Sequence, residues 1–187
     1  GQYGRLRLYP ALRTDTYWMP KGKMRLAANP RLGINLQPVA AWPRLHLKAQ
    51  IGRAFRVPTF NDRYWQPGGT PNLRPEESWG GDTGLRFDHS RGHVEVTVFA
   101  HRRRNQIVWQ PTEKDYWAPT NVGRVRALGG SLSMAWTWSL PLNARLQTRG
   151  AFTRTDARNR SNPSSATYNK PVRYVPRNQM KGQATLT

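Results

Sequence analysis

The sequence predicts an all-β fold, an antiparallel meander of long strands, from three observations. Apolar and polar residues alternate along several segments, which is the period of a strand with one apolar and one polar face. The connections between these segments alternate between short and long. No segment shows the 3.6-residue period of an amphipathic helix. We therefore expect strands that follow one another in chain order.

The alternation runs through residues 44–52, 93–101 and 131–140, with shorter versions at 32–36, 85–87 and 144–146. In the second segment the apolar side is formed by Val94, Val96 and Val98. The stretch from His93 to Trp109 suits one strand of roughly 17 residues, about 55 Å long. Such a strand overshoots a hydrocarbon core of about 30 Å even when it is tilted.

The short connections fall near residues 38–43, 88–92 and 139–143, and the long ones near 14–28, 56–76, 110–120 and 157–175. Tight turns at one end and long loops at the other are typical of outer-membrane β-barrels, in which the apolar face meets lipid and the polar face lines a wet lumen. A small soluble barrel would instead pack its apolar face inside. Both architectures have period 2, but the long strands favour the membrane barrel.

The charge balance is strongly basic, with 30 Lys and Arg against 10 Asp and Glu and a formal net charge of +20. Such a chain suits a polyanionic partner, either nucleic acid or an anionic membrane surface. Aromatic residues near the expected strand ends suit interfacial girdles: Tyr9, Trp42, Trp79, Trp109, Trp117, Trp136 and Trp138. We expect the basic residues on the polar faces: Arg5, Arg7, Arg44, Lys48, Arg86, Arg102, Arg104, Arg124, Arg126, Arg145 and Arg149.

Two boxes around one long connection identify a family. A strand end at Phe55, Arg56 and Pro58 is followed, after a loop, by Pro71, Asn72, Leu73, Pro75 and Glu76. This resembles the TonB-dependent outer-membrane receptors, in which a Phe-Arg-x-Pro box, an extracellular loop and an Asn-Pro-x-Leu-x-Pro-Glu box stand in this order. Thr70 stands where the family usually has Asn.

The resemblance implies a 22-stranded barrel with an N-terminal plug that TonB contacts. Residues 1–187 have room for about eight to nine of those strands, so we expect a partial barrel without the plug. The implied function is uptake of a scarce nutrient, a ferric siderophore or a similar metal chelate, across a Gram-negative outer membrane. The implied partners are that ligand, the lipid bilayer and its lipopolysaccharide, and the inner-membrane TonB complex acting through the plug. No cofactor is implied.

The boxes can also be interpreted physically as the base of a loop. Pro58 cannot donate a ladder hydrogen bond and ends the strand, whereas Arg56 and Glu76 flank the loop and suit a cross-strand pair. Ligand contacts are expected at the loop tips, where aromatic and basic side chains suit an anionic, aromatic ligand. The candidates are Arg63, Tyr64, Trp65, Tyr116 and Trp117.

Enzyme chemistry is not expected. The chain has no Cys, which excludes disulfides, Cys-ligated zinc and thiol catalysis. His89 and His93 bracket a turn, but no carboxylate or Cys pattern completes a metal site. Two rival functions remain at this point: a basic soluble β-barrel that binds nucleic acid, and a porin-like outer-membrane barrel that works without TonB. The nucleic-acid-binding rival leaves the two boxes unexplained, and the porin-like rival keeps the membrane location but has no nutrient ligand.

Overall fold

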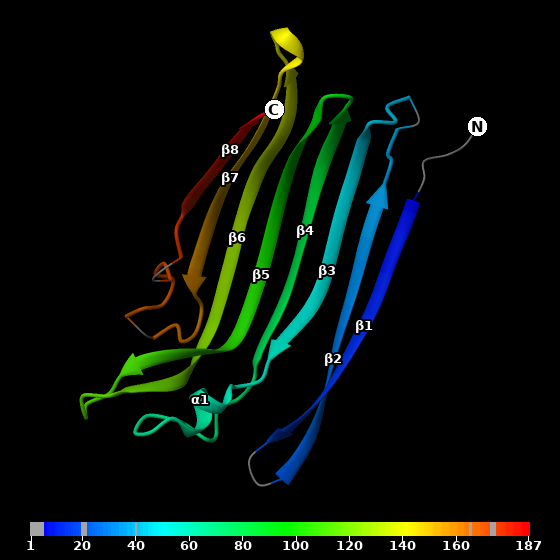
Figure 1. The fold of residues 1–187 in the computed structure, drawn as a ribbon. Coiled ribbons are helices and arrows are strands. Elements are labelled where there is room, and N and C mark those ends of the chain that lie inside the picture. The colour runs from blue at the N-terminus through cyan, green and yellow to red at the C-terminus, as the bar shows by residue number, and fades with distance from the viewer. Residues whose placement is uncertain (1–5, 20–21, 40, 165, 173–174) are drawn as a thin grey trace.

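The computed structural model describes residues 6–19, 22–39, 41–164, 166–172 and 175–187, and its strands form a single antiparallel sheet (Figure 1). Eight strands lie side by side in chain order. They are β1 (Leu6–Met19), β2 (Lys23–Leu36), β3 (Leu45–Arg56), β4 (Glu76–His89), β5 (Gly92–Pro111), β6 (Trp117–Ser139), β7 (Arg145–Asn159) and β8 (Asn178–Leu186). A short helix, α1 (Phe60–Tyr64), follows β3, and a 3-10 turn (Pro141–Asn143) follows β6. The predicted all-β meander of eight to nine strands is confirmed. In the described segments, no helix has both the length and the apolar character needed to cross a membrane.

The connections gather at the two ends of the sheet as the sequence predicts. Two of the four connections predicted to be long, those near 14–28 and 110–120, are shorter in the structure. Thr14 pairs with Ala28 and Met19 with Lys23, so most of residues 14–28 is strand. Likewise β5 runs to Pro111 and β6 begins at Trp117, which leaves residues 112–116 as the loop. These strand ends are rich in Thr, Tyr and Trp, which suit a strand, but apolar and polar residues alternate there over no more than four residues, at 23–26.

The register places the apolar residues of neighbouring strands on one face. Leu45 lies opposite Phe87, which lies opposite Val94, which lies opposite Met134. In the first half of β5, Val94, Val96 and Val98 are exposed, and Glu95 and Thr97 between them are half-buried. Side chains on the inside of a curved sheet crowd one another, so the sheet curves toward its polar face. We call the face of Val94 the outer face and the face of Glu95 the inner face.

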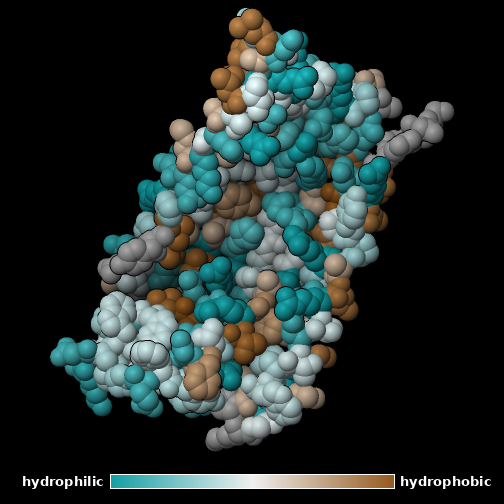
Figure 2. Space-filling model, in the orientation of Figure 1, coloured by the Kyte–Doolittle hydropathy of each residue, from teal (hydrophilic) through white to brown (hydrophobic). Residues whose placement is uncertain are grey.

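Figure 2 shows a hollowed face on which hydrophilic residues predominate. A soluble nucleic-acid-binding barrel requires Leu45 and Val94 to be packed in a closed interior. In the described sheet they are not packed in this way. The sheet of the described residues is instead open at β1 and β8, because each of these strands is paired on one side only.

One prediction about the faces is wrong. Arg102 lies opposite Arg126 and Arg104 opposite Arg124, and all four are an even number of residues from Val94 or Met134, so they lie on the outer face. The run of three arginines at 102–104 hides the phase of the alternation, which is set only by the valines before it. Five further basic residues for which the inner face is predicted do lie there: Arg7, Lys48, Arg86, Arg145 and Arg149. Arg5 lies outside the described residues, and Arg44 immediately precedes β3.

Candidate functional site

The loop between β3 and β4, residues 57–75, begins with a capped helical turn. The Thr59 hydroxyl accepts a hydrogen bond from the Asp62 backbone N–H (3.1 Å), and the Asp62 carboxylate accepts one from the Thr59 N–H (2.9 Å). This reciprocal capping box satisfies two of the orphan donors at the start of α1. The Thr-x-x-Asp signal is present in the sequence, but a helix as short as α1 has no apolar period that reveals it.

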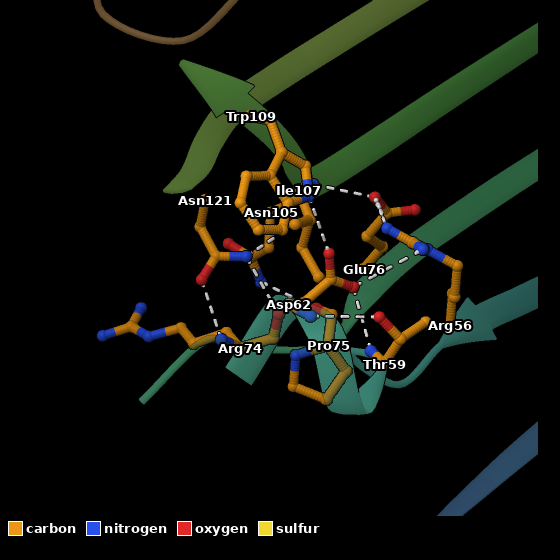
Figure 3. Close-up of polar contacts among 10 residues, drawn as sticks. All are labelled: Arg56, Thr59, Asp62, Arg74, Pro75, Glu76, Asn105, Ile107, Trp109 and Asn121. Atoms are coloured by element: carbon orange, nitrogen blue, oxygen red, sulfur yellow. Dashed lines mark hydrogen bonds and ion pairs between the residues drawn. The ribbon is translucent and has the colours of Figure 1, made fainter. Parts of the chain in front are cut away.

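Asp62 connects three elements (Figure 3). Its Oδ1 also accepts from the indole Nε1 of Trp109 on β5 (3.1 Å), and its Oδ2 lies 3.7 Å from Nη1 of Arg56 at the end of β3. Burial opposes ionisation of this carboxyl group most strongly. The hydrogen bonds from Thr59 and Trp109 and the charge of Arg56 together outweigh burial and hold the pKa of Asp62 below its ordinary value. Asp62 is therefore a buried, ionised crosslink.

The predicted pair of Arg56 and Glu76 is confirmed. The two residues lie opposite each other on β3 and β4, and Nη2 of Arg56 donates to Oε1 of Glu76 over 3.0 Å. The same oxygen accepts the backbone N–H of Ile107 (2.7 Å). Near Asn105, whose φ is +54°, β5 leaves the β4 ladder. The Glu76 side chain therefore replaces the strand partner that the Ile107 N–H has lost.

Asn121 on β6 holds the end of the same loop. Its Oδ1 accepts the backbone N–H of Arg74 (2.7 Å), and its Nδ2 donates to the carbonyl of Arg74 and to that of Asn105, each over 2.9 Å. The side-chain amide thus pairs with the Arg74 backbone as a neighbouring strand would. Figure 3 shows Asn121 and Arg74 on one side of the loop base and Arg56 on the other.

The residues of the two family boxes lie around this base. Pro58 and Leu73 are buried, and Leu73 is only 2% exposed. Phe55 contacts the ring of Tyr17, with 5.3 Å between the ring centroids. Pro75 is half-buried beside Glu76, whereas Pro71 and Asn72 are exposed in a turn. The sequence boxes therefore mark a loop base, and the polar partners Asp62, Trp109 and Asn121 were not predicted from them.

The structure brings the two loops that carry the ligand candidates together. A Cβ atom at Gly68 would overlap the backbone carbonyl of Trp117, so only glycine permits this contact between the loops. Tyr64, Trp65 and Trp117 are 47%, 55% and 59% exposed, and Tyr116 is half-buried. We call these four aromatic residues the loop tip. The tip places large apolar surface in solvent above the polar base.

Arg63 is placed differently from the other candidates. Its side chain is buried, with the residue 8% exposed, and its Nη1 donates to the carbonyl of Trp18 over 3.2 Å. Arg63 therefore ties α1 to the β1–β2 hairpin. A ligand at the surface would not meet its guanidinium in this conformation.

The histidines form no metal cluster in the part of the chain that is described, where no group of three or more His, Asp or Glu side chains is placed to hold an ion. His93 lies opposite Asp88 across the β4–β5 turn, and His89 stacks on Trp136 with 5.1 Å between the rings. Their contacts are those of a hairpin end.

Comparison with known proteins gives a consistent result. The β-barrel model of the TonB-dependent receptor-like family matches residues 2–187. A vitamin B12 transporter BtuB of Vibrio vulnificus is 33% identical over 82 residues, which cover 43% of this chain and 13% of that protein. A vitamin B12 transporter BtuB of Photobacterium profundum is 31% identical over 125 residues, which cover 62% of this chain and 21% of that protein.

A solved structure, the copper transporter OprC, superposes with a TM-score of 0.68 at 20% identity, and the match covers 97% of this chain and 29% of that one. At this identity the superposition concerns the fold alone. The chain spans less than a third of the length of each of these three proteins.

Proposed function

Because the chain belongs to the family of TonB-dependent receptors, we propose that it forms part of the wall of a receptor that imports a metal chelate. The family places the chain in the outer membrane of a Gram-negative cell. The chelate is a ferric siderophore or a corrinoid such as vitamin B12, since two relatives are named as vitamin B12 transporters. Energy would reach this wall through a plug and the inner-membrane TonB complex.

The exposed aromatic rings of the loop tip are the observation that supports a metal chelate as the ligand. Tyr64 and Trp65 present exposed rings on a loop whose base is fixed by hydrogen bonds, and Trp117, at the start of β6, presents a third exposed ring beside them. Aromatic rings supply large contact area with little conformational entropy to lose. A bulky chelate with flat or aromatic groups suits such a surface better than a small hydrated ion does.

We further propose that residues 1–187 supply eight strands of a larger barrel. In the described sheet, β1 and β8 each offer one unpaired edge, and an exposed edge is a template for another strand. Strands from the rest of the full-length receptor would pair there and close the wall. The inner face, where Lys48 lies 3.1 Å from Glu95, would then surround the plug.

The test is uptake by cells that depend on the full-length receptor. Uptake of radiolabelled ferric siderophores and of labelled vitamin B12 is compared for the wild type and the variant Trp65→Ala/Trp117→Ala. We expect one chelate to require TonB for uptake and its half-saturating concentration to rise about tenfold in the variant, because two aromatic contacts are lost.

The matched control is Trp138→Ala, which removes an indole with 46% exposure from the opposite end of the sheet. Its half-saturating concentration should stay at the wild-type value. If no chelate enters in a TonB-dependent way, the proposed substrate class is wrong. If uptake is TonB-dependent but both variants behave as the wild type, the ligand does not contact the loop tip.

A further inference from the structure

The end of the β1–β2 hairpin is separate from the strand ladder of the rest of the sheet. β2 pairs with β3 only from Arg31 to Leu36, whereas its pairing with β1 continues to Lys23. Pro30 stands at the point of separation and has no N–H to donate to a ladder. Figure 1 shows the hairpin leaving the side of β3. We call residues 14–19 and 23–29 the hairpin end.

Two arginines dock the hairpin end, and each donates to a backbone carbonyl. Nη1 of Arg53 on β3 donates to the carbonyl of Ala28 over 3.0 Å. Nη1 of Arg63 in α1 donates to the carbonyl of Trp18 over 3.2 Å. In the described chain no backbone hydrogen bond joins the hairpin end to β3 or to α1. The hairpin end can therefore leave its neighbours without the loss of any ladder bond.

The two arginines differ in how their charges are compensated. Arg53 lies 3.3 Å from Glu77. Arg63 is only 8% exposed, yet among the described residues it takes part in no ion pair. Its neighbour Asp62 already has partners for both carboxylate oxygens. A buried charge without a partner of opposite sign is costly, so an anion that reached Arg63 would be bound favourably.

The donors of Arg63 are also poorly used. Its Nε is buried and has no hydrogen-bond partner, and the acceptor nearest to its Nη2 is the Met19 sulfur at 3.9 Å, which is a weak acceptor. One other buried side-chain polar atom of the described residues lacks a partner, and it is Oδ1 of Asn29, next to Ala28. Buried polar atoms normally have partners. The docked hairpin end thus leaves its contact surface incompletely satisfied.

Arg63 lies beside the aromatic rings of the loop tip in the chain. Tyr64 and Trp65 follow it directly and are 47% and 55% exposed. A guanidinium group offers a planar fork of N–H donors that matches two oxygens of a carboxylate or phosphate. The Trp18 carbonyl, a neutral single acceptor, now holds one arm of this fork. An anion on the fork would stand next to rings that are available to the same ligand.

We propose that the hairpin end is an autoinhibitory contact, which an anionic group of the imported chelate releases by displacing the Trp18 carbonyl from Arg63. The group is a carboxylate, catecholate or phosphate. Its charge-assisted hydrogen bonds are stronger than the bond to a neutral carbonyl. Because hairpin and anion compete for one guanidinium, the anion binds only the released state and shifts the population toward it. The proposal rests on the proposed function for the source of the anion.

The experiment measures the position of the hairpin end in the full-length receptor in detergent. Spin labels are attached at Thr16→Cys on the hairpin end and at Gln110→Cys on β5, both exposed positions in a chain without Cys of its own. Double electron–electron resonance gives the distance between the labels. Citrate is the probe, and sodium chloride at equal ionic strength controls for charge screening. We expect citrate, and not chloride, to populate a longer distance in the wild type.

The two docking arginines give variants whose expected effects have opposite signs. In Arg63→Gln the response to citrate should be lost, because the anion has no guanidinium to bind. In Arg53→Gln the half-saturating citrate concentration should fall about fivefold, because one docking bond is lost while the anion site is kept. Mere support of the hairpin by both arginines would instead give changes of the same sign.

Three results of the citrate titration would overturn the proposal. They are no response in the wild type, an unchanged response in Arg63→Gln, and a weaker response in Arg53→Gln. If Arg63→Gln does not fold, Arg63→Lys takes its place, and its half-saturating concentration should be about tenfold above the wild-type value because a point charge replaces the fork. A wild-type value in Arg63→Lys would count against the fork.

Uptake by cells then identifies the source of the anion. The half-saturating concentration of the imported chelate should be at least about tenfold higher in Arg63→Gln than in Arg53→Gln. Equal values would mean that the anion does not belong to the chelate, and the proposal would fail. Because citrate probes Arg63 without any chelate, this failure is distinct from the absence of TonB-dependent uptake.

Discussion

The base and the tip of the loop between β3 and β4 are built in opposite ways. At the base, Asp62 is 5% exposed, and its carboxylate accepts hydrogen bonds from Thr59 and Trp109 and lies beside Arg56. Both carboxylate oxygens therefore have partners. At the tip, Trp65 is 55% exposed and presents its ring to solvent. The two parts are separated by only a few residues of chain.

The difference assigns separate roles to the two parts. The base joins β3, β4, β5 and β6 through side chains that substitute for strand partners, as Glu76 does for Ile107 and Asn121 for Arg74. The hydrogen bonds of the base stabilise one conformation of the loop. The rings of Tyr64, Trp65 and Trp117 at the tip are exposed and are free to meet a ligand. Variants of the base should therefore change the stability of the loop, and variants of the tip should change binding alone.

The largest effect is expected where the loop meets its neighbour. Gly68→Ala places a methyl group on the carbonyl of Trp117, so the two loops must separate, at a cost of about 3 kcal/mol. Hydrogen–deuterium exchange of the full-length receptor should then show faster exchange across residues 57–75. Gly182→Ala is the control, because among the described residues no atom outside its two chain neighbours lies within 4 Å of the new methyl group. Equal exchange in both variants would mean that the contact does not hold the loop.

The next effect comes from the base itself. Glu76→Ala leaves the Ile107 N–H and the Arg56 guanidinium without their acceptor, which costs about 2 kcal/mol of loop stability. Glu77→Ala is the neighbouring control, since its side chain is 43% exposed and its only ion pair is with Arg53 among the described residues. An exposed pair of this kind is worth less than about 1 kcal/mol. Hydrogen–deuterium exchange of the Ile107 amide is measured in both variants. Similar exchange rates in Glu76→Ala and Glu77→Ala would contradict the role of Glu76.

The fold could be predicted where the chain alternates and where proline interrupts it. Period 2 at residues 93–101 and 131–140 predicted the central strands, and the boxes at Arg56 and Glu76 predicted the bounds of the loop. The prediction failed at 14–28 and 110–120, where Thr14 and Ala28 pair beyond the alternating apolar stretch. Residues 14–16 carry no apolar side chain, and Met24 and Leu26 alternate with Lys23 and Arg25 over only four residues, so the side-chain pattern gives little sign of this backbone pairing.

The site was only partly predictable, for reasons of distance along the chain. Asn121 pairs with Arg74, which is 47 residues away in the sequence, and no local sequence pattern predicts such a contact. Arg63 has the chemistry of a ligand-binding residue, but the carbonyl that it binds belongs to Trp18. The capping box at Thr59 is a local signal and could have been found.

A smaller effect should appear with pH. The pKa of Asp62 is held below its ordinary value, so its stabilising contribution is fully present above the ordinary carboxyl pKa. It is lost as the pH falls through the lowered value in the folded loop. The ¹⁹F resonance of 5-fluorotryptophan at position 109 should report opening of the base in acid. In Asp62→Asn the neutral amide does not titrate, so the resonance should be shifted from the start and independent of pH in this window.

The smallest effect on stability is expected at the tip. Trp65→Ala removes a largely exposed ring, and such a surface substitution changes the free energy of the loop by no more than about 0.5 kcal/mol. Exchange across residues 57–75 should match the wild type while the affinity for the chelate falls, because the lost ring contacts the ligand and not the base. Glu76→Ala should give the reverse order, with faster exchange and a weaker ligand site only because the tip is no longer held in place. If Trp65→Ala speeds exchange as much as Glu76→Ala does, the tip also supports the loop, and the division between base and tip fails.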